Sequence, residues 1–298
     1  MKKIFPIVLC LLHCTIFLSA QRTDKKLQSK IEDAIKGFNG DIGVYVKDLR
    51  SGKTVSIHAD TIFPTASIVK VPILIGVMDK INNKQLDYDQ ELLYRDSLAY
   101  SDYDVTASFK DTTKILLKKV IMLMLTTSDN TASLWLQGLV GGTRINSILD
   151  SLGFKDTRVN SRTTGRENNR TNYGWGQTTP NEMGRIFERI YRSEIYNPAI
   201  CERMMRCLGR NYWDEDEAIS QIPPYIEVFS KNGCVNEIRS EAMIVNAPHN
   251  PYVFCIFTKK NKDISWTHNN EAWALARKIS LLLWRYFEPK DKWEPSTK

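Results

Sequence analysis

The alternation of apolar and polar residues predicts strands near both ends of the chain and helices between them. Leu27–Phe38 has the period of an amphipathic helix. Residues 41–49 and 54–58 predict a β-hairpin, because two strand-like runs flank the turn residues Ser51-Gly52-Lys53. The C-terminal part predicts three more strands and a last amphipathic helix, at residues 225–230, 241–246, 252–258 and 270–287.

The middle of the chain predicts mainly helices. They are expected from Ser67 onward, at about 114–125, after Asn130, at 143–152 and at about 181–192. Residues 155–179, in contrast, are polar, rich in Gly, Asn, Arg and Thr, and without periodicity. Because so long a loop within a compact domain is unusual unless it is functional, we expect it to border a site.

These elements predict an α/β fold with a second, all-α lobe. The hairpin and the three C-terminal strands can share one antiparallel five-stranded sheet, flanked by the N- and C-terminal helices. We expect the α/β lobe at about residues 21–60 and 210–290, and the all-α lobe at about 61–209. Together they would form one catalytic domain, residues 21–298, with a cleft between the lobes.

The first 20 residues have the pattern of a secretory signal peptide. Lys2 and Lys3 precede a short apolar run, and the small residue Ala20 precedes the expected cleavage site. We therefore expect an exported protein, periplasmic or secreted, with no membrane span after cleavage. Cleavage would lower the formal net charge from +7 to +5. The charges are dispersed and form no nucleic-acid-binding motif, so no nucleic-acid partner is expected.

Four cysteines follow the signal peptide, namely Cys201, Cys207, Cys234 and Cys255. In a helix, Cys201 and Cys207 would be about 9 Å apart along the axis, too far for a disulfide. The spacings match no zinc site. We expect buried thiols, although the spacings do not exclude one disulfide. No metal or other cofactor is expected. The protein is expected to be a monomer.

Ser67 and Lys70 form the one Ser-x-x-Lys of the chain. Residues three apart lie on the same side of a helix, so the lysine amine would lie beside the serine hydroxyl. A serine becomes a nucleophile when a neighbouring base takes its proton, and a Ser–Lys pair is one such arrangement. Taken alone, so short a motif more often marks a surface serine beside a solvated lysine.

Three downstream motifs change that interpretation. They are Ser128-Asp-Asn130, Thr178-Thr179-Pro180 at the end of the long loop, and Lys231-Asn-Gly233 on or near a predicted strand. Singly, the first could be a helix N-cap and the last a turn. In this order, together with Ser67-Ile-Val-Lys70, they resemble the class A β-lactamase and penicillin-binding-protein-like serine hydrolases across the mature chain.

The resemblance implies a role for each matching residue. Ser67 would attack a β-lactam or a peptidoglycan-like amide and become acylated, and Lys70 would accept its proton. Ser128 would pass a proton to the leaving nitrogen, while Asn130 would hold Lys70 and the amide side chain of the substrate.

The third motif would bind the substrate. Lys231 would meet the substrate carboxylate, and Gly233 would let the substrate lie against its strand. The oxyanion hole of the family maps to the backbone N–H groups of Ser67 and Cys234.

Two further residues are matched more loosely. Arg239 lies within one position of the arginine with which the family binds a carboxylate, although a surface arginine is an equal alternative. Tyr103 could be the aromatic residue of the cleft wall.

The chain departs from the family pattern at two places. Asn232 stands where the family usually has Thr or Ser, so an amide replaces a hydroxyl that contacts the substrate. The long loop has no Glu-x-x-Leu-Asn, and its one acid between Arg158 and Pro180 is Glu167. Glu167 could be the base that activates water for deacylation, or it could pair with a neighbouring surface arginine.

Three functions are consistent with the sequence. The first is an exported β-lactamase with a Ser67 acyl-enzyme, and the second is a penicillin-binding-type peptidase that acts on cell-wall peptides. The third is a non-hydrolytic β-lactam-binding module. The third function is opposed by the intact site residues, whereas the departures at Asn232 and in the loop weaken the first. The intact residues are Ser67, Lys70, Ser128, Asn130 and Lys231.

Overall fold

The computed structural model of the chain describes residues 22–296, so the predicted signal peptide lies outside the described residues. The largest sheet has five antiparallel strands in the order β2-β1-β10-β9-β8. Its strands are β1 (Asp41–Asp48), β2 (Thr54–Ile57), β8 (Val228–Val235), β9 (Ile238–Val245) and β10 (Tyr252–Lys259). This order confirms the predicted five-stranded sheet, in which β8 is an edge strand.

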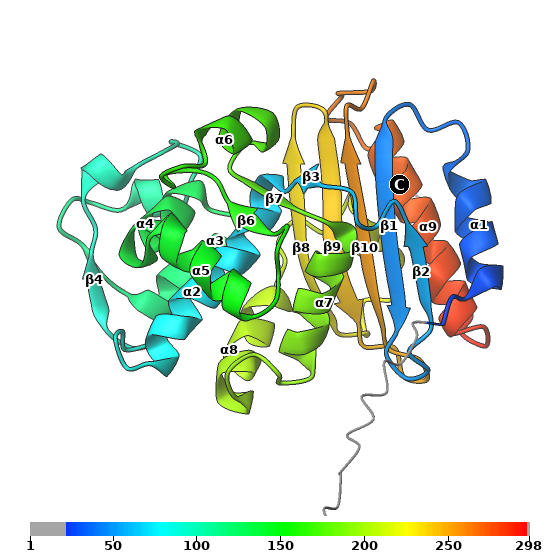
Figure 1. Ribbon diagram of the computed structural model, residues 1–298, viewed down its shortest axis with the longest axis horizontal. Coiled ribbons are helices and arrows are strands. Elements are labelled where there is room, and N and C mark those ends of the chain that lie inside the picture. The colour runs from blue at the N-terminus through cyan, green and yellow to red at the C-terminus, as the bar shows by residue number, and fades with distance from the viewer. Residues whose placement is uncertain (1–21, 297–298) are drawn as a thin grey trace, which may run out of the picture.

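The two terminal helices, α1 (Lys25–Ile35) and α9 (Glu271–Phe287), cover one face of this sheet (Figure 1). Alternate strand residues point to this face. Val44, Val46 and Phe254 pack there in one apolar cluster with Leu27 of α1 and Ile279 of α9. The predicted arrangement of the terminal helices is therefore confirmed.

The opposite face is covered by α7 (Pro180–Tyr191), which contacts β1, β9 and β10. Gly184 allows this close approach, because a Cβ atom there would lie 2.5 Å from the ring of Tyr45. The remaining helices lie beside the sheet on the side of β8 (Figure 1). They are α2 (Lys70–Asn82), α3 (Leu117–Thr126), α4 (Asn130–Val140), α5 (Gly142–Ser151), α6 (Glu167–Tyr173) and α8 (Pro198–Leu208).

The central helix of this helical part is α2. Its residues from Lys70 to Asp79 are all buried, and it contacts α3, α4, α5 and α8. A helix that is apolar on all sides is stable only when other elements surround it. The chain reaches α2 through the 3₁₀ helix η1 (Ala66–Val69), which packs against β8 and thereby joins the helices to the sheet.

Short elements complete the fold. The small strands are β3 (Phe63–Pro64), β4 (Glu91–Leu93), β5 (Lys114–Leu116), β6 (Arg158–Val159) and β7 (Gly176–Thr178). The other 3₁₀ helices are η2 (Asp96–Leu98), η3 (Thr106–Ser108) and η4 (Ala218–Gln221). No helix within residues 22–296 is long and apolar enough to cross a membrane.

Three local predictions were wrong. The strand expected at residues 225–230 lies at Val228–Val235 as β8, because residues 224–226 form a turn in which Ile226 N–H donates to the Pro223 oxygen. The helix expected from residue 114 begins at Leu117, because residues 114–116 pair with β4 as strand β5. The loop at 155–179 contains β6, β7 and the seven-residue helix α6. Helix α6 buries none of its residues, so it carries no apolar periodicity that the sequence could reveal.

Candidate active site

Ser67 lies within η1, and Lys70 begins α2 directly after it. Lys70 Nζ donates a hydrogen bond to Ser67 Oγ over 2.9 Å. Ala66, before the serine, has a left-handed backbone with φ 44°, an uncommon conformation for a residue with a side chain. This turn brings the hydroxyl and the amine together, as the spacing in the sequence predicted.

The Lys70 amine also contacts the loop before α4. It lies 2.8 Å from the backbone oxygen of Ser128, 3.0 Å from Ser128 Oγ and 2.8 Å from Asn130 Oδ1. Ser128 has a left-handed backbone with φ 59°, and both of its oxygens face Lys70. The first two motifs, which are 58 residues apart in the sequence, therefore meet at one nitrogen.

The side chain of Lys70 is completely buried. Burial, and secondarily the positive charge of Lys231, holds the pKa of Lys70 well below its usual value. An ammonium group has three protons, whereas four oxygens surround this nitrogen. A neutral Lys70 would have a lone pair with which to accept the Ser67 proton.

Two buried carboxylates hold the Ser128–Asn130 loop in place. Asp129 caps α4 by accepting the N–H of Ala132 over 2.7 Å, and it accepts the N–H of Thr106 over 2.7 Å. Asp104 accepts the N–H of Asn130 over 2.9 Å and that of Thr131 over 2.8 Å. The sequence did not single out Asp104, because a lone acid outside a motif carries no spacing signal.

Lys231, Asn232 and Gly233 all lie on β8, the edge strand beside η1. Lys231 Nζ donates to the backbone oxygen and to Oδ1 of Asn232, each over 2.9 Å. Burial lowers the pKa of Lys231 to about 8. A Cβ atom at Gly233 would lie 2.4 Å from the backbone oxygen of Thr65 and 3.1 Å from Ser67 N. The missing side chain thus allows β8 to lie against the turn that carries Ser67.

Some of the predicted residues border two cavities that meet at Ser67, whereas Lys70, Lys231 and Gly233 line neither. The first, of about 870 Å³, is lined by Ser67, Ser128, Asn130, Asn232 and Cys234. Its outer wall is aromatic and acidic, with Tyr103, Tyr212, Trp213, Trp266 and the acidic run of residues 214–217. Tyr103 is fully exposed and lines this cavity, as expected for a residue of the cleft wall.

A second cavity, of about 850 Å³, lies on the loop side of Ser67. Residues 171–175 of the long loop line it together with Tyr100 and Lys259. Ser67, Asn130 and Cys234 line both cavities. The serine is therefore accessible from two sides.

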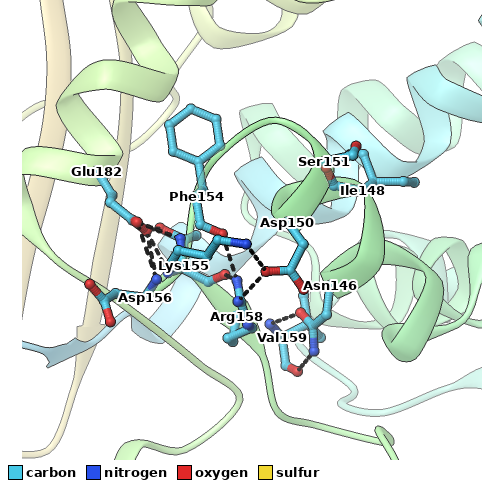
Figure 2. A network of polar contacts seen from close by, with 11 residues as sticks. Asn146, Ile148, Asp150, Ser151, Phe154, Lys155, Asp156, Arg158, Val159 and Glu182 are labelled. Carbon is cyan, nitrogen blue, oxygen red and sulfur yellow. Dashed lines mark hydrogen bonds and ion pairs between the residues drawn. The ribbon is translucent and has the colours of Figure 1, made fainter.

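The long loop is fixed at its base by two buried side chains from neighbouring helices (Figure 2). Glu182, in the first turn of α7, accepts the N–H of Lys155 over 2.6 Å and that of Thr157 over 2.7 Å. Asn146 of α5 accepts the N–H of Val159 over 2.8 Å and donates to its carbonyl oxygen over 2.9 Å. The loop therefore begins from a fixed position relative to α5 and α7.

The structure does not bring Glu167 to the Ser67–Lys70 contacts. Its side chain is exposed, lines neither cavity, and accepts the N–H of Gly165 over 3.1 Å. The alternative prediction, an ion pair between Glu167 and a neighbouring surface arginine, is not observed among the described residues either. Arg166 is instead bound to Asn160 Oδ1 and Gln177 Oε1 beneath the loop.

Arg239 also lies away from these contacts. Only 2% of the residue is exposed, and it borders neither cavity. Its guanidinium donates to four backbone oxygens, and it lies over the rings of Trp266 and Trp273, 4.4 and 4.6 Å from their centres. Arg239 is therefore not a surface arginine, and it does not border the cavities in which a substrate carboxylate was expected to contact it.

The four cysteines are free thiols, of which Cys201, Cys207 and Cys255 are buried and Cys234 is partly exposed. Cys234 lines both cavities next to Ser67, where its backbone N–H was expected to contribute. Within residues 22–296, no group of three or more His, Cys, Asp or Glu side chains could hold a metal ion.

The fold is that of the class A β-lactamase and penicillin-binding-protein-like superfamily, as the motifs predicted. The model of the beta-lactamase enzyme family matches residues 26–287, so the chain belongs to that family. The membership confirms the expected hydrolase acting on β-lactam amide bonds.

Curated relatives are similar over most of their length. Beta-lactamase VEB-1 of Pseudomonas aeruginosa is 22% identical over 300 residues, which cover 96% of this chain and 98% of that protein. Beta-lactamase 3 of Bacillus cereus is 26% identical over 289 residues, or 88% of each protein.

Solved structures share the fold. PBP-A superposes with a TM-score of 0.79 and 22% identity over 90% of this chain and 98% of its own. A class A beta-lactamase from Mycobacterium abscessus superposes with a TM-score of 0.77 and 21% identity, over 88% and 99%. A PBP-A mutant has been solved as an acyl-enzyme complex with penicillin G.

Proposed function

We propose that the chain is an exported serine hydrolase of the class A β-lactamase type, which opens a β-lactam amide through an acyl-enzyme on Ser67. The observation that carries this proposal is the position of Lys70 Nζ, within 3.0 Å of Ser67 Oγ, Ser128 Oγ and Asn130 Oδ1. A buried amine with a lowered pKa is a base suited to activating a serine. Export rests on the signal-peptide pattern of residues 1–20.

In the acylation step, Ser67 Oγ attacks the β-lactam carbonyl carbon while its proton passes to the Lys70 amine. The carbonyl oxygen becomes an oxyanion, which the N–H groups of Ser67 and Cys234 would stabilise. One such donor typically contributes about 10²–10³ in rate. The C–N bond then breaks, the electron pair returns to form the ester carbonyl, and the ring nitrogen takes a proton from Ser128, which Lys70 replenishes.

Binding of the substrate would depend on β8. The Lys231 ammonium would pair with the substrate carboxylate, and the edge of β8 would pair with the substrate amide as an added strand. Asn130 Nδ2 is free to donate to the substrate side chain, because its Oδ1 accepts from Lys70. The expected monomer stays a prediction.

Hydrolysis of the acyl-enzyme is the slower half of the proposed reaction. The loop residues that line the second cavity, 171–175, are Thr, Asn, Tyr, Gly and Trp and include no carboxylate. A positioned general base typically contributes about 10²–10⁴ in rate. The loop therefore supplies no such base, although Glu237 lines the same cavity and Asp104 lines the first. Without a positioned base, water would attack slowly and the acyl-enzyme would persist.

This feature favours a second candidate function, a penicillin-binding-type peptidase for which β-lactams are slow inhibitors. Such an enzyme acylates Ser67 by the same chemistry but acts on a cell-wall peptide. The combined volume of the two cavities gives room for a substrate larger than a β-lactam nucleus.

One experiment distinguishes these functions. The purified mature protein is mixed with a chromogenic cephalosporin, and colour and intact mass are followed over time. Rapid turnover without a lasting adduct supports the β-lactamase, whereas a long-lived adduct supports the peptidase. Ser67→Ala is expected to abolish both signals, and Ser51→Ala, in the turn between β1 and β2, is expected to keep them. Absence of any adduct or turnover would leave only the binding module and would refute acylation.

A further inference from the structure

The residue that departs from the family pattern, Asn232, is held at both ends of its side-chain amide. Its Oδ1 accepts from Lys231 Nζ over 2.9 Å, and its Nδ2 donates to Glu217 Oε1 over 2.8 Å. The three residues are 6%, 0% and 8% exposed, respectively. They form a short chain of hydrogen bonds from an acid in the wall of the first cavity to the lysine of the third motif.

Only one orientation of the Asn232 amide satisfies both neighbours. An ammonium group donates and cannot accept, whereas an ionised carboxylate accepts and cannot donate. With Lys231 protonated and Glu217 ionised, the amide points its oxygen at Lys231 and its nitrogen at Glu217, as the two hydrogen bonds show; burial raises the pKa of Glu217, so this requirement holds at pH values above that pKa. A Thr or Ser hydroxyl would donate and accept through one atom, whereas the amide separates its acceptor and its donor at two fixed ends.

Glu217 is itself fixed by a second acid on the neighbouring strand. Glu217 precedes η4, and the first residue of that helix, Ala218, donates its N–H to Glu241 Oε2 over 2.7 Å. Glu241 lies on β9 directly opposite Asn232 in the register of the sheet. The segment that carries Glu217 is thus attached to β9 while Glu217 reaches β8.

We propose that Glu217 is a positioning residue, which orients Lys231 for the substrate carboxylate by fixing the Asn232 amide between them. The inference rests on the proposed function, because the carboxylate partner of Lys231 belongs to that function. One hydrogen of Asn232 Nδ2 is left for the substrate, since Glu217 takes the other. Asn232, which lines the first cavity, then contributes a donor of fixed direction.

Glu217 also acts on Lys231 through its charge. The groups that face Lys231 are Lys70, Cys234, Glu217 and Glu241, and the charge of Glu217 raises the pKa of Lys231 against the larger effect of burial. Removal of that charge should let Lys231 lose its proton at a lower pH. The substrate carboxylate needs the protonated lysine, so substrate affinity decreases at high pH as Lys231 loses its proton. In the absence of the Glu217 charge, this decrease would begin at a lower pH.

Two variants separate these effects. Glu217→Ala removes the acceptor and the charge, whereas Glu217→Gln removes the charge but leaves an oxygen that can accept from Asn232. We expect Glu217→Ala to weaken the apparent binding constant for a chromogenic cephalosporin about tenfold, with the limiting acylation rate changed less than about twofold. Glu217→Gln should restore most of the binding. In both variants, however, the decrease of substrate affinity at high pH should begin at a lower pH than in the wild type.

The control and a double-mutant cycle complete the test. Glu227, at the other end of β8, also accepts from an asparagine amide, that of Asn246, so Glu227→Ala is the matched control and should change neither measurement. In an Asn232→Ala background, Glu217→Ala should cause almost no further loss of binding below pH 7, because the hydrogen-bond connection to Lys231 is already absent. The change in pH dependence should remain, because the charge of Glu217 acts on Lys231 directly. Independent, multiplying effects of the two substitutions would refute the proposal.

A measurement without substrate distinguishes failure of this inference from failure of the proposed function. The lysine side chains are ¹³C-labelled, and the titration of Lys231 is followed by NMR in the wild-type protein and in Glu217→Gln. A lower pKa in the variant supports the connection even if no cephalosporin acylates Ser67. An unchanged Lys231 titration would refute the connection, whether or not acylation occurs.

Discussion

Asp104 Oδ1 accepts the backbone N–H of Asn130 over 2.9 Å, and Asn130 in turn accepts a hydrogen bond from Lys70. Asp104 itself contacts neither Ser67 nor Lys70. The other oxygen of Asp104 accepts the N–H and the hydroxyl of Thr131. The residue is 8% exposed. The geometry around the Lys70 amine therefore depends on a carboxylate in the preceding loop.

Asp104→Asn is expected to disturb this loop, because an amide nitrogen would face donors that now reach a carboxylate oxygen. An unsatisfied buried polar group costs about 1–3 kcal/mol, so the free energy of unfolding should fall by about that amount. The acylation rate should fall with it. Urea unfolding and stopped-flow acylation measure the two effects. The exposed neighbour Asp102 is the control, and Asp102→Asn should change stability by less than about 0.5 kcal/mol.

Lys70→Met should lower the acylation rate by about 10²–10⁴, the usual contribution of a positioned base. The substitution keeps the length of the side chain but removes the amine that contacts Ser67 and Ser128. Lys80→Met is the matched control on the same helix, since Lys80 donates only to the backbone oxygen of Leu139. Because burial lowers the pKa of Lys70, wild-type acylation should decline only when the pH falls low enough to protonate the amine. Equal rates for Lys70→Met and the wild type would exclude Lys70 as the base.

Glu167→Gln should leave the lifetime of the acyl-enzyme within about twofold of the wild type. The reason is that the Glu167 side chain is exposed and borders neither cavity beside Ser67. The decay of the adduct, followed by intact mass, measures this lifetime. A decay slowed by the 10²–10⁴ expected for loss of a general base would instead identify Glu167 as the deacylating residue.

Glu241→Gln should change how stability depends on pH. Burial raises the pKa of Glu241 from 4.5 to about 8, so between these values the folded protein keeps a proton that the unfolded chain has lost. Stability of the wild type should therefore fall as the pH rises through this window, by on the order of 1.4 kcal/mol per unit of pKa difference at most.

Urea unfolding at pH 5, 7 and 9 measures the effect. Glu241→Gln should lack this part of the decline, so its stability relative to the wild type should increase with pH. Parallel curves for the two proteins would contradict the buried, protonated state of Glu241. Asp41→Asn offers a comparison on the same sheet, because Asp41 is exposed at the start of β1.

The sequence predicted the elements that carry strong periodicity and the motifs that carry chemistry. The five strands, the terminal helices and the Ser67–Lys70 contact follow from patterns within short segments, whereas the meeting of Lys70 with Ser128 and Asn130 was expected only from the family resemblance. Helix α6 could not be predicted because its residues remain exposed, so hydrophobic periodicity is absent.

The supporting residues of the site were harder to find. Arg239 was placed by counting from the third motif, but two tryptophans from a segment about 30 residues away determine its orientation. Glu217 belongs to a run of four acids, which by composition resembles a solvated surface segment. Its burial depends on β8 and β9, and a long-range contact of this kind leaves no local signal in one sequence.

Gly233 fixes how closely the sheet approaches the nucleophile. Since a Cβ atom there would overlap the backbone oxygen of Thr65, sheet and helices touch backbone to backbone beside Ser67. The outer walls of the first cavity, in contrast, include the exposed side chains of Tyr103 and Trp213. Substitutions in these outer walls would change which substrates fit, while the backbone contact that sets the acylation geometry stayed the same.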